Sequence, residues 1–154
     1  MDSDKVLSLI NEALEVNDEL FLIDCHIAQS GSIEVIVDGD HGVALEECIR
    51  ISRHIEHNLD RENFDFSLVV TTPDITKPIS NPRQYRKNLG RILTVEVGNE
   101  KIEGKLIDIV EDQIVLEYQA KIPKEKGKGK QTVIKQDSIS IDKINKAKVK
   151  IVYN

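Results

Sequence analysis

The sequence predicts an α+β protein of two units, an N-terminal domain of order α-β-β-α-β and a small C-terminal antiparallel β-barrel. Three observations support this fold class. Apolar residues recur at mixed helical and strand spacings in the first half and at strand spacing in the second. Pro73, Pro78 and Pro82 fall between the halves, where proline stops a helix or a sheet from continuing. The sign of the net charge changes at the same place.

Charge divides the chain into a predicted acidic domain, residues 1–81, and a predicted basic domain, residues 82–154. The first contains 5 Lys+Arg against 17 Asp+Glu, a net charge of −12, and the second contains 16 against 10, a net charge of +6. Such asymmetry indicates different partners for the two domains. We expect the basic domain to contact a polyanion and the acidic domain to face a basic protein, unless the acidic charge serves solubility alone.

The first domain opens with an amphipathic helix over about residues 3–16, because Val6, Leu9, Ile10 and Leu14 recur at helical spacing. A half-buried strand and its hairpin partner follow, with a turn at "QSGS" between them. The inward-facing residues are predicted to be Phe21, Ile23, Cys25 and Ile27 in the first strand, and Ile33, Val35 and Val37 in the second.

The turn "GDHGV" leads into the clearest helix of the sequence. Its buried stripe is predicted to consist of Leu45, Cys48, Ile49, Ser52, Ile55 and Leu59. A third strand is predicted from Phe64 to Val70. Cys25 and Cys48 lie among apolar neighbours, so we expect two buried reduced thiols, with a disulfide or a metal pair as the alternative.

Five short alternating segments follow the prolines, separated by turn signals such as "GNE" and "VED". They are residues 91–97, 101–110, 113–119, 132–136 and 147–153. They predict a small barrel of SH3-like or Sm-like type, with "SIDKIN" forming one helical turn before the last strand. Residues 121–131 are rich in lysine and cannot bury a core, so we expect a mobile, projecting basic loop.

Basic side chains gather in two places of the second domain. Arg83, Arg86, Lys87 and Arg91 stand around Tyr85 in the sequence, and Lys121, Lys124, Lys126, Lys128 and Lys130 occupy the predicted loop. Cations that neutralise phosphates give affinity without base specificity. Because aromatic residues are scarce, we expect an RNA contact that reads backbone and shape rather than bases. A solvated lysine loop without a partner is the alternative.

No catalytic, cofactor or metal motif is complete in this sequence. Neither a G-x-S-x-G elbow nor a phosphate-binding glycine loop occurs. "DGDHG" resembles the start of a calcium loop, but Val43 and Ile49 stand where that loop needs glycine and glutamate. His54 and His57 lack further ligands at zinc-site spacing. We therefore expect no catalytic activity, no cofactor and no metal.

The sequence also bears on location. No apolar run approaches the roughly 18 residues that span a bilayer. The segment "MDSDKVLSLINEAL" is acidic and amphipathic, unlike a signal peptide. We therefore expect a cytoplasmic protein without a membrane partner.

Three motifs stand in order along the chain: "IVDGDHGVALEECIRISRHIEHNLD", "VVTTPDITKPI" and "YRKNLGRILTVEV". In order and spacing they resemble the ribosome maturation factor RimP family, whose pattern contains a "GI-LDDC-xx-SR" helix ending in "LD" and a strand running into "SSPGLDRPL". The matching residues are Asp38, Gly42, Leu45, Cys48, Ser52, Arg53, Leu59, Asp60, Pro73 and Pro78. Thr71 and Thr72 replace two serines, whereas Asp74, Thr76 and Lys77 stand where the family has glycine, aspartate and arginine.

The resemblance implies a KH-like N-terminal domain and an SH3-like C-terminal barrel. It implies a non-catalytic factor for maturation of the small (30S) ribosomal subunit. Such a factor binds the immature particle, its ribosomal RNA and a basic ribosomal protein of the decoding region, and we expect it to be a monomer. The expected ribosome- and RNA-binding residues are Arg53, Thr71, Thr72, Lys77, Arg83, Arg86, Lys87, Lys121, Lys124, Lys126, Lys128 and Lys130.

Residues 72–82 are interpreted as a stiff joint, since proline restricts itself and the residue before it to extended geometry. Two other functions stay open from the sequence. A stand-alone Sm-like RNA-binding regulator would associate through barrel edges, and light scattering would then show a hexamer. An enzyme acting on RNA would show metal-dependent turnover.

Overall fold

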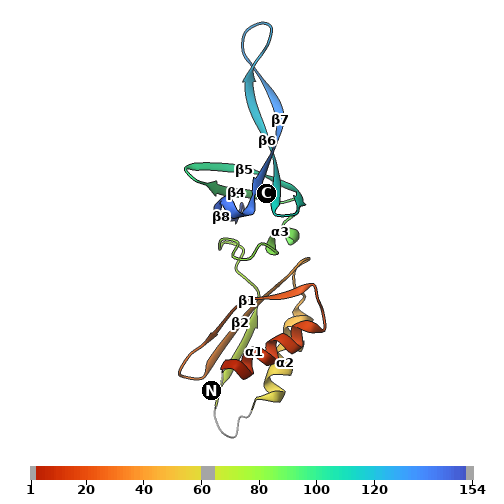
Figure 1. Cartoon of the computed structure of the whole chain (residues 1–154), viewed down its shortest axis with the longest axis vertical. Helices are drawn as coiled ribbons and strands as arrows, with labels where there is room; N and C mark the ends of the chain where they lie inside the picture. Colours follow the sequence, from red (N-terminus) through yellow and green to blue (C-terminus); the bar gives the residue numbers. More distant parts are fainter. Residues whose placement is uncertain (1–2, 60–64, 152–154) are drawn as a thin grey trace. The chain divides into compact units, whose positions relative to one another are not determined.

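The computed structural model describes residues 3–59 and 65–151. The chain divides into two compact units, unit 1 from Met1 to Asp74 and unit 2 from Ile75 to Asn154. Unit 1 combines helices with a three-stranded sheet, and unit 2 is built on a five-stranded antiparallel sheet (Figure 1). This confirms the mixed α+β class, whereas the KH-like and SH3-like assignments stay predictions. None of the described helices has both the length and the apolar composition needed to cross a lipid bilayer.

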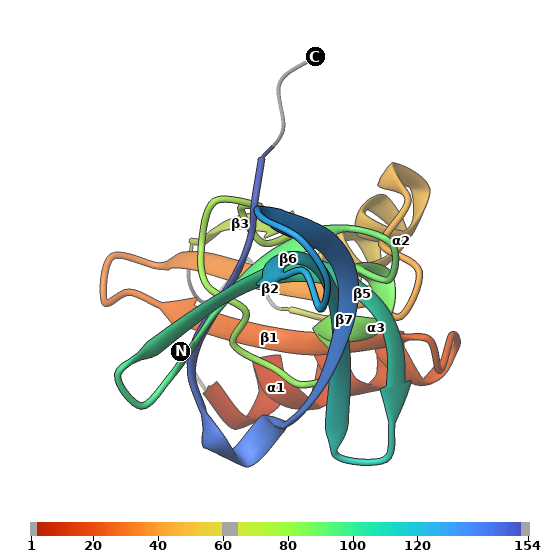
Figure 2. The same ribbon diagram turned by 90° about the horizontal axis from the view of Figure 1, so that it is seen from above.

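Unit 1 has the predicted order of elements. They are α1 (Ser3–Glu15), β1 (Leu20–Ile27), β2 (Ser32–Gly39), α2 (Leu45–Asn58) and β3 (Ser67–Thr71). β2 lies in the middle of the sheet, antiparallel to β1 and parallel to β3. Both helices cover one face, with α1 along β1 and α2 along β3 (Figure 2). The predicted strand start at Phe64 and the motif residue Asp60 lie outside the described residues.

The core of unit 1 differs from the predicted pattern in β1. The pairing of β1 with β2 shifts at a bulge around Ile23, where an extra residue is inserted. Leu22 before the bulge, and Cys25 and Ile27 after it, pack against the core, whereas Phe21 is buried outside this cluster. The predicted alternation is therefore wrong at Ile23 and correct at Cys25 and Ile27.

The buried stripe of α2 also differs from the prediction. The buried residues of this helix are Cys48, Ile51 and Ile55, followed by Leu59 just after its end. Leu45 and Ile49 are 71% and 40% exposed, and Ser52 is only half-buried. The prediction is wrong at these three positions because two neighbouring stripes of this helix both have apolar residues at helical spacing.

Arg50 joins the two helices of unit 1. Its Nη1 donates a hydrogen bond to the backbone carbonyl of Ala13 in α1 over 2.8 Å, and its Nη2 donates to Glu47 over 2.7 Å. The hydrogen bond from Arg50 lowers the pKa of the Glu47 carboxyl. The planar guanidinium can serve both acceptors because it carries five N–H donors.

Both cysteines are free thiols of the unit 1 core. Cys25 is half-buried and Cys48 is buried, and they form no disulfide. Burial raises the pKa of both thiols, and the neighbouring carboxylates of Asp24 and Glu47 raise it further. Both side chains therefore stay protonated and act as small apolar residues.

The turn between β2 and α2 requires glycine at Gly39. A Cβ at this position would lie 2.3 Å from the carbonyl oxygen of Gly42, too close for any other residue. Asp38 is buried, and its Oδ1 accepts the backbone N–H of Gly39 over 2.9 Å. The "DGDHG" segment therefore makes a tight connection from strand to helix.

The described part of unit 2 consists of a short helix, five strands and one 3-10 turn. They are α3 (Gln84–Lys87), β4 (Ile92–Val97), β5 (Glu100–Val110), β6 (Gln113–Pro123), β7 (Lys130–Ser140), η1 (Ile141–Lys143) and β8 (Ile144–Val149). The strands pair antiparallel in the order β7-β6-β5-β4-β8. Their core residues are Tyr85, Leu93, Val95, Leu106, Ile114, Leu116, Ile139 and Ala147. The end of the last predicted strand, Val152 and Tyr153, lies outside the described residues.

β6 and β7 are longer than predicted. Pairing runs without interruption from Gln113 opposite Ser140 to Pro123 opposite Lys130, and the hairpin extends beyond the rest of the sheet (Figure 1). The prediction of a loop over residues 121–131 is therefore wrong at both ends. Only residues 124–129 connect the strands, because the residues before and after them satisfy each other's backbone groups across the hairpin.

Candidate nucleic-acid interface

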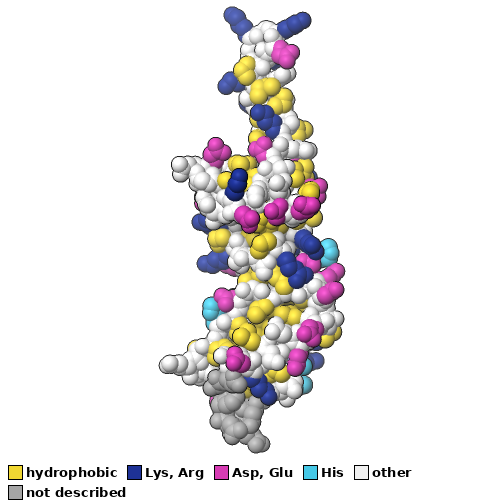
Figure 3. Space-filling view, in the orientation of Figure 1, with side chains coloured by type: hydrophobic (Ala, Val, Ile, Leu, Met, Phe, Trp, Pro, Cys, Tyr) yellow, Lys and Arg dark blue, Asp and Glu magenta, His cyan; other side chains and the backbone are white. Residues whose placement is uncertain are grey.

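Five lysines gather at the far end of the β6–β7 hairpin, and we call them the hairpin lysines. They are Lys121, Lys124, Lys126, Lys128 and Lys130, and all five are exposed. Figure 3 shows the dark blue cationic side chains at this tip. Glu125 is the only acidic residue between the first and the last of them. The tip is therefore strongly cationic.

The pairing of the strands decides where the hairpin lysines lie. Lys121 stands opposite Thr132, and Pro123 stands opposite Lys130, so the first and the last lysine share one face of the hairpin. The other three belong to the connecting turn, where Gly129 has a φ of 101°, a left-handed conformation that favours glycine. The lysines are thus presented at the end of a paired backbone.

The base of the hairpin is anchored in the core of unit 2. Ile114 and Leu116 of β6 are completely buried. Farther out, the Tyr118 hydroxyl donates a hydrogen bond to Asp137 Oδ2 across the strands over 2.7 Å. This hydrogen bond raises the pKa of Tyr118, since ionisation would break it and place two negative charges together. The cationic tip is therefore carried on strands that are fixed at their base.

The basic residues after the prolines lie on and beside a short helix. They are Arg83, Arg86 and Lys87. Gln84 between them is 4% exposed, and its Oε1 accepts the backbone N–H groups of Ser80 and Asn81 over 2.8 and 2.9 Å. Tyr85, which stands among the basic residues in the sequence, is buried in the core and does not present its ring to solvent. This segment is therefore well fixed, but it has no exposed aromatic platform.

A second basic surface was missed by the sequence reasoning. The outer face of β5, β4 and β8, opposite the core, carries lysines that pair across the strands, and we call them the sheet-face lysines. They are Lys101, Lys105, Lys146, Lys148 and Lys150. Glu96 stands between Lys101 and Lys146, and Glu103 forms an ion pair with Lys150. The alternate lysines of "KAKVK" are the sequence signal that could have revealed this face.

Three of the remaining expected residues belong to unit 1, namely Arg53, Thr71 and Thr72, and Lys77 belongs to unit 2. Arg53 is exposed on α2, one helical turn after the exposed Ile49. Thr71 ends β3 and is half-buried, whereas Thr72 and Lys77 are exposed. These four residues are therefore distributed over both units.

The described surface of unit 1 is acidic. Its exposed carboxylates are Asp4, Glu12, Glu15, Asp18, Glu19, Asp24, Glu34, Glu46, Asp65 and Asp74. The exposed Lys and Arg side chains among the described residues of this unit are Lys5 and Arg53. Unit 1 therefore presents the opposite sign of charge to the lysines of unit 2.

His54, considered above beside His57, contacts a carboxylate. Its Nε2 lies 2.9 Å from Glu12 Oε2, which links α2 to α1. Within residues 3–59 and 65–151, no group of three or more His, Cys, Asp or Glu side chains is arranged to hold a metal ion. His54 therefore has a structural contact within unit 1.

Comparison with known proteins places this chain in a family. The model of the RimP N-terminal domain matches residues 9–76. The ribosome maturation factor RimP of Christiangramia forsetii is 45% identical over 153 residues, which cover 99% of this chain and 100% of that protein. The factor of the same name from Flavobacterium psychrophilum is 40% identical over 150 residues, 97% of each chain. That of Porphyromonas gingivalis is 29% identical over 148 residues, 96% of this chain and 97% of the relative. The resemblance of the three motifs is thereby confirmed, and the chain belongs to the ribosome maturation factor RimP family.

Proposed function

We propose that this chain is a non-catalytic factor that acts in the cytoplasm and assists maturation of the small ribosomal subunit. It binds the immature particle through RNA and also binds a basic ribosomal protein. The observation that carries this proposal is the identity of 45% and 40%, over nearly the whole chain, with proteins named ribosome maturation factor. The alignments with these relatives cover both units of the chain, so the proposal concerns the two units together.

The RNA contact is assigned to unit 2. The hairpin lysines and the basic residues around α3 supply cations that neutralise phosphates and release counterions. The tip offers no aromatic side chain, which fits recognition of the RNA backbone rather than of base edges. Arg53, Thr71, Thr72 and Lys77 complete the proposed ribosome-binding set.

The protein contact is assigned to unit 1. Its exposed carboxylates outnumber its exposed cations among the described residues, and charge of this sign attracts a basic ribosomal protein. Leu45 and Ile49 add an apolar strip beside Arg53 on α2, where a partner side chain can be desolvated. The proposed partner is a basic protein of the decoding region of the small subunit.

Sedimentation of cell extract through a density gradient tests this function. We expect the chain to migrate with free small subunits and not with translating ribosomes, and to dissociate as salt is raised. Changing the five hairpin lysines to glutamine should weaken the association, and changing them to arginine should preserve it because the charge remains. A chain that stays at the top of the gradient at low salt would contradict the proposed function.

The stiff joint over residues 72–82 remains part of the proposal. Replacing Pro73 and Pro78 by glycine should loosen the segment, since glycine has more backbone freedom than any other residue. NMR relaxation should then report more independent tumbling of the two units, together with weaker binding to the particle. Unchanged relaxation and unchanged binding would refute the joint.

A further inference from the structure

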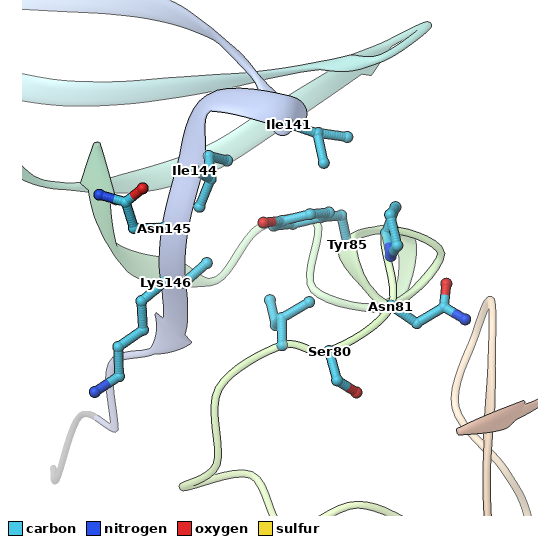
Figure 4. Close-up of a pocket in the computed structure, with 10 residues that line it drawn as sticks. Ser80, Asn81, Tyr85, Ile141, Ile144, Asn145 and Lys146 are labelled. Atoms are coloured by element: carbon cyan, nitrogen blue, oxygen red, sulfur yellow. The ribbon is translucent and has the colours of Figure 1, made fainter. Parts of the chain in front are cut away.

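Unit 2 contains a small pocket that the hairpin and the sheet face do not explain. It has a volume of about 140 Å³ and lies between the segment that precedes α3 and the η1–β8 segment (Figure 4). One water molecule needs roughly a tenth of this volume. Apolar walls come from Ile79, Pro82, Ile141, Ile144 and Ala147, and the polar lining comes from Ser80, Asn81, Asn145 and Lys146. A flat group with both apolar and hydrogen-bonding parts fits such a lining.

Tyr85 supplies the pocket with a hydrogen-bonding group. The residue is 3% exposed and lines the pocket, and its hydroxyl oxygen is directed toward the side of Asn145 and Lys146 (Figure 4). Burial alone raises the pKa of Tyr85, so the hydroxyl keeps its proton. A tyrosine hydroxyl in the wall of a pocket can donate a hydrogen bond to a polar acceptor of a ligand, while its ring packs against the core.

The walls of the pocket are held in place by hydrogen bonds. Ile79 donates its backbone N–H to the carbonyl of Ala147 in β8 over 2.8 Å. On the same wall, Gln84 holds the backbone of Ser80. On the opposite side, Asn145 Nδ2 donates to the carbonyl of Gly98 over 3.2 Å. The pocket is therefore formed before a ligand arrives, which reduces the entropy cost of binding.

Charge indicates which kind of ligand the pocket accepts. Lys146 lines the pocket and also belongs to the sheet-face lysines, where Lys101 and Lys148 lie in the same shallow depression. A ligand seated beside Tyr85 would therefore have cations next to its outer end. An extended peptide is less suitable, because Ile79 already occupies a β8 backbone carbonyl that such a peptide would need for strand pairing.

We propose that this pocket receives one nucleotide of single-stranded RNA. The Tyr85 hydroxyl donates to an acceptor on the base, the isoleucine side chains pack against the base, and Lys146 neutralises the adjoining phosphate. This inference rests on the proposed RNA contact of unit 2, but it adds a single-nucleotide site away from the hairpin tip. Duplex RNA cannot use the site without unpairing, so loops and single-stranded ends are its targets.

NMR titration of the full chain with uridine monophosphate, adenosine monophosphate and the oligonucleotides U4 and A4 tests this site. We expect the oligonucleotides to shift the backbone amides of Ser80, Tyr85 and Asn145, and to bind more tightly than the mononucleotides because they add phosphates. Tyr85→Phe, which keeps the ring, should weaken oligonucleotide binding by about threefold to tenfold, the range of one hydrogen bond. Tyr118→Phe is the matched control, since that hydroxyl bonds Asp137 outside the pocket, and binding should not change.

A second pair of variants tests the phosphate contact. Lys146→Gln should weaken oligonucleotide binding and lower its salt dependence, whereas Lys143→Gln, an exposed lysine of η1 that does not line the pocket, should do neither. Unchanged pocket amides while RNA binds elsewhere on the chain would overturn the site but leave the proposed function standing. Equal affinity for mononucleotide and oligonucleotide would overturn an RNA strand as the ligand. If RNA binds nowhere on the chain, both proposals fall.

Discussion

The two lysine-rich surfaces of unit 2 differ in how their charge is balanced. The hairpin tip and the outer sheet face carry five lysines each. At the tip, Glu125 is the only acidic residue within the lysine run, whereas on the sheet face Glu96 and Glu103 stand between lysines of neighbouring strands. Equal numbers of lysines therefore do not give equal attraction for an anion.

The two lysine surfaces also differ in the contacts that a bound anion has to displace. Glu103 already pairs with Lys150, so a phosphate that approaches the sheet face competes with a carboxylate that is present. Exposed ion pairs of this kind are worth little in stability, but they compensate charge locally. The hairpin tip thus suits long-range attraction of a polyanion, and the sheet face suits closer contacts with an anion next to the Tyr85 pocket.

The largest expected effect concerns the core from which the hairpin extends. Leu116→Ala removes a completely buried side chain at its base and should lower the free energy of unfolding of unit 2 by about 2–5 kcal/mol. Urea denaturation followed through NMR signals of β4 to β8 measures this. Ile134→Ala, on the same hairpin but 67% exposed, is the control and should change stability by less than about 0.5 kcal/mol. Similar effects of the two variants would mean that the hairpin is not anchored by its base.

The second prediction compares the two lysine sets directly. One variant changes the five hairpin lysines to glutamine, and the other changes the five sheet-face lysines. The hairpin variant should bind ribosomal RNA more weakly than the sheet-face variant. Its slope of log K against log salt should become shallower by about 0.7–0.9 for each phosphate that is no longer neutralised. Filter binding at several salt concentrations measures both quantities. Equal weakening of RNA binding in the two variants would show that the two lysine surfaces do not differ in their attraction for RNA.

The third prediction concerns the two turns that bound β6. Glu111 lies in the turn between β5 and β6. Among the residues that the structure describes, it is the non-glycine residue whose φ is positive, at 54°. Glu111→Gly should raise the free energy of unfolding by about 0.5–1 kcal/mol, since relief of the left-handed strain exceeds the entropy cost of glycine. Glu125→Gly in the tip turn removes the same charge without relieving strain, so it should not stabilise. Stabilisation by both variants would point to charge rather than backbone strain.

The smallest expected effect is a shift in the pKa of Tyr118. Asp137→Asn should lower the pKa of Tyr118 toward its ordinary value, because the charged acceptor of its hydroxyl is removed. The raised pKa contributes stability below about pH 10, and that contribution is lost as the pH rises through the folded-state value. The variant should therefore lose less stability than the original chain in this range. Ultraviolet absorbance titration in a background with Tyr85→Phe and Tyr153→Phe follows the ionisation of Tyr118 alone, and Glu117→Gln serves as the control. If Asp137→Asn left the pKa of Tyr118 unchanged, the hydrogen bond to Asp137 would not be the cause of the raised pKa.

Much of the fold could be predicted from local patterns. The order of elements in unit 1, the strands of unit 2 and the η1 turn all follow from apolar periodicity and turn residues. The bulge at Ile23 could not be predicted, since an inserted residue leaves no mark in composition. The choice of Ile51 over Ser52 on α2 depends on which helix face meets α1 and the sheet, a tertiary property.

The candidate interface was less predictable than the fold. The hairpin lysines stand out because they are close together in the sequence. The sheet-face lysines come from three neighbouring strands and meet only through the register of β5, β4 and β8. The same holds for the Tyr85 pocket, whose lining joins residues 79–85 to residues 141–147. A surface assembled from distant segments needs the pairing of strands before it can be recognised.

The backbone hydrogen bond from Ile79 to Ala147 also bears on self-association. A bare outer strand invites another copy of the same molecule to extend the sheet, which begins aggregation. Here the segment before α3 occupies one backbone carbonyl of β8 through Ile79. The strand at the other edge of the sheet, β7, carries Lys130 and Lys135, whose positive charges repel the same strand of a second copy. Both features oppose extension of the unit 2 sheet by a second copy of the chain.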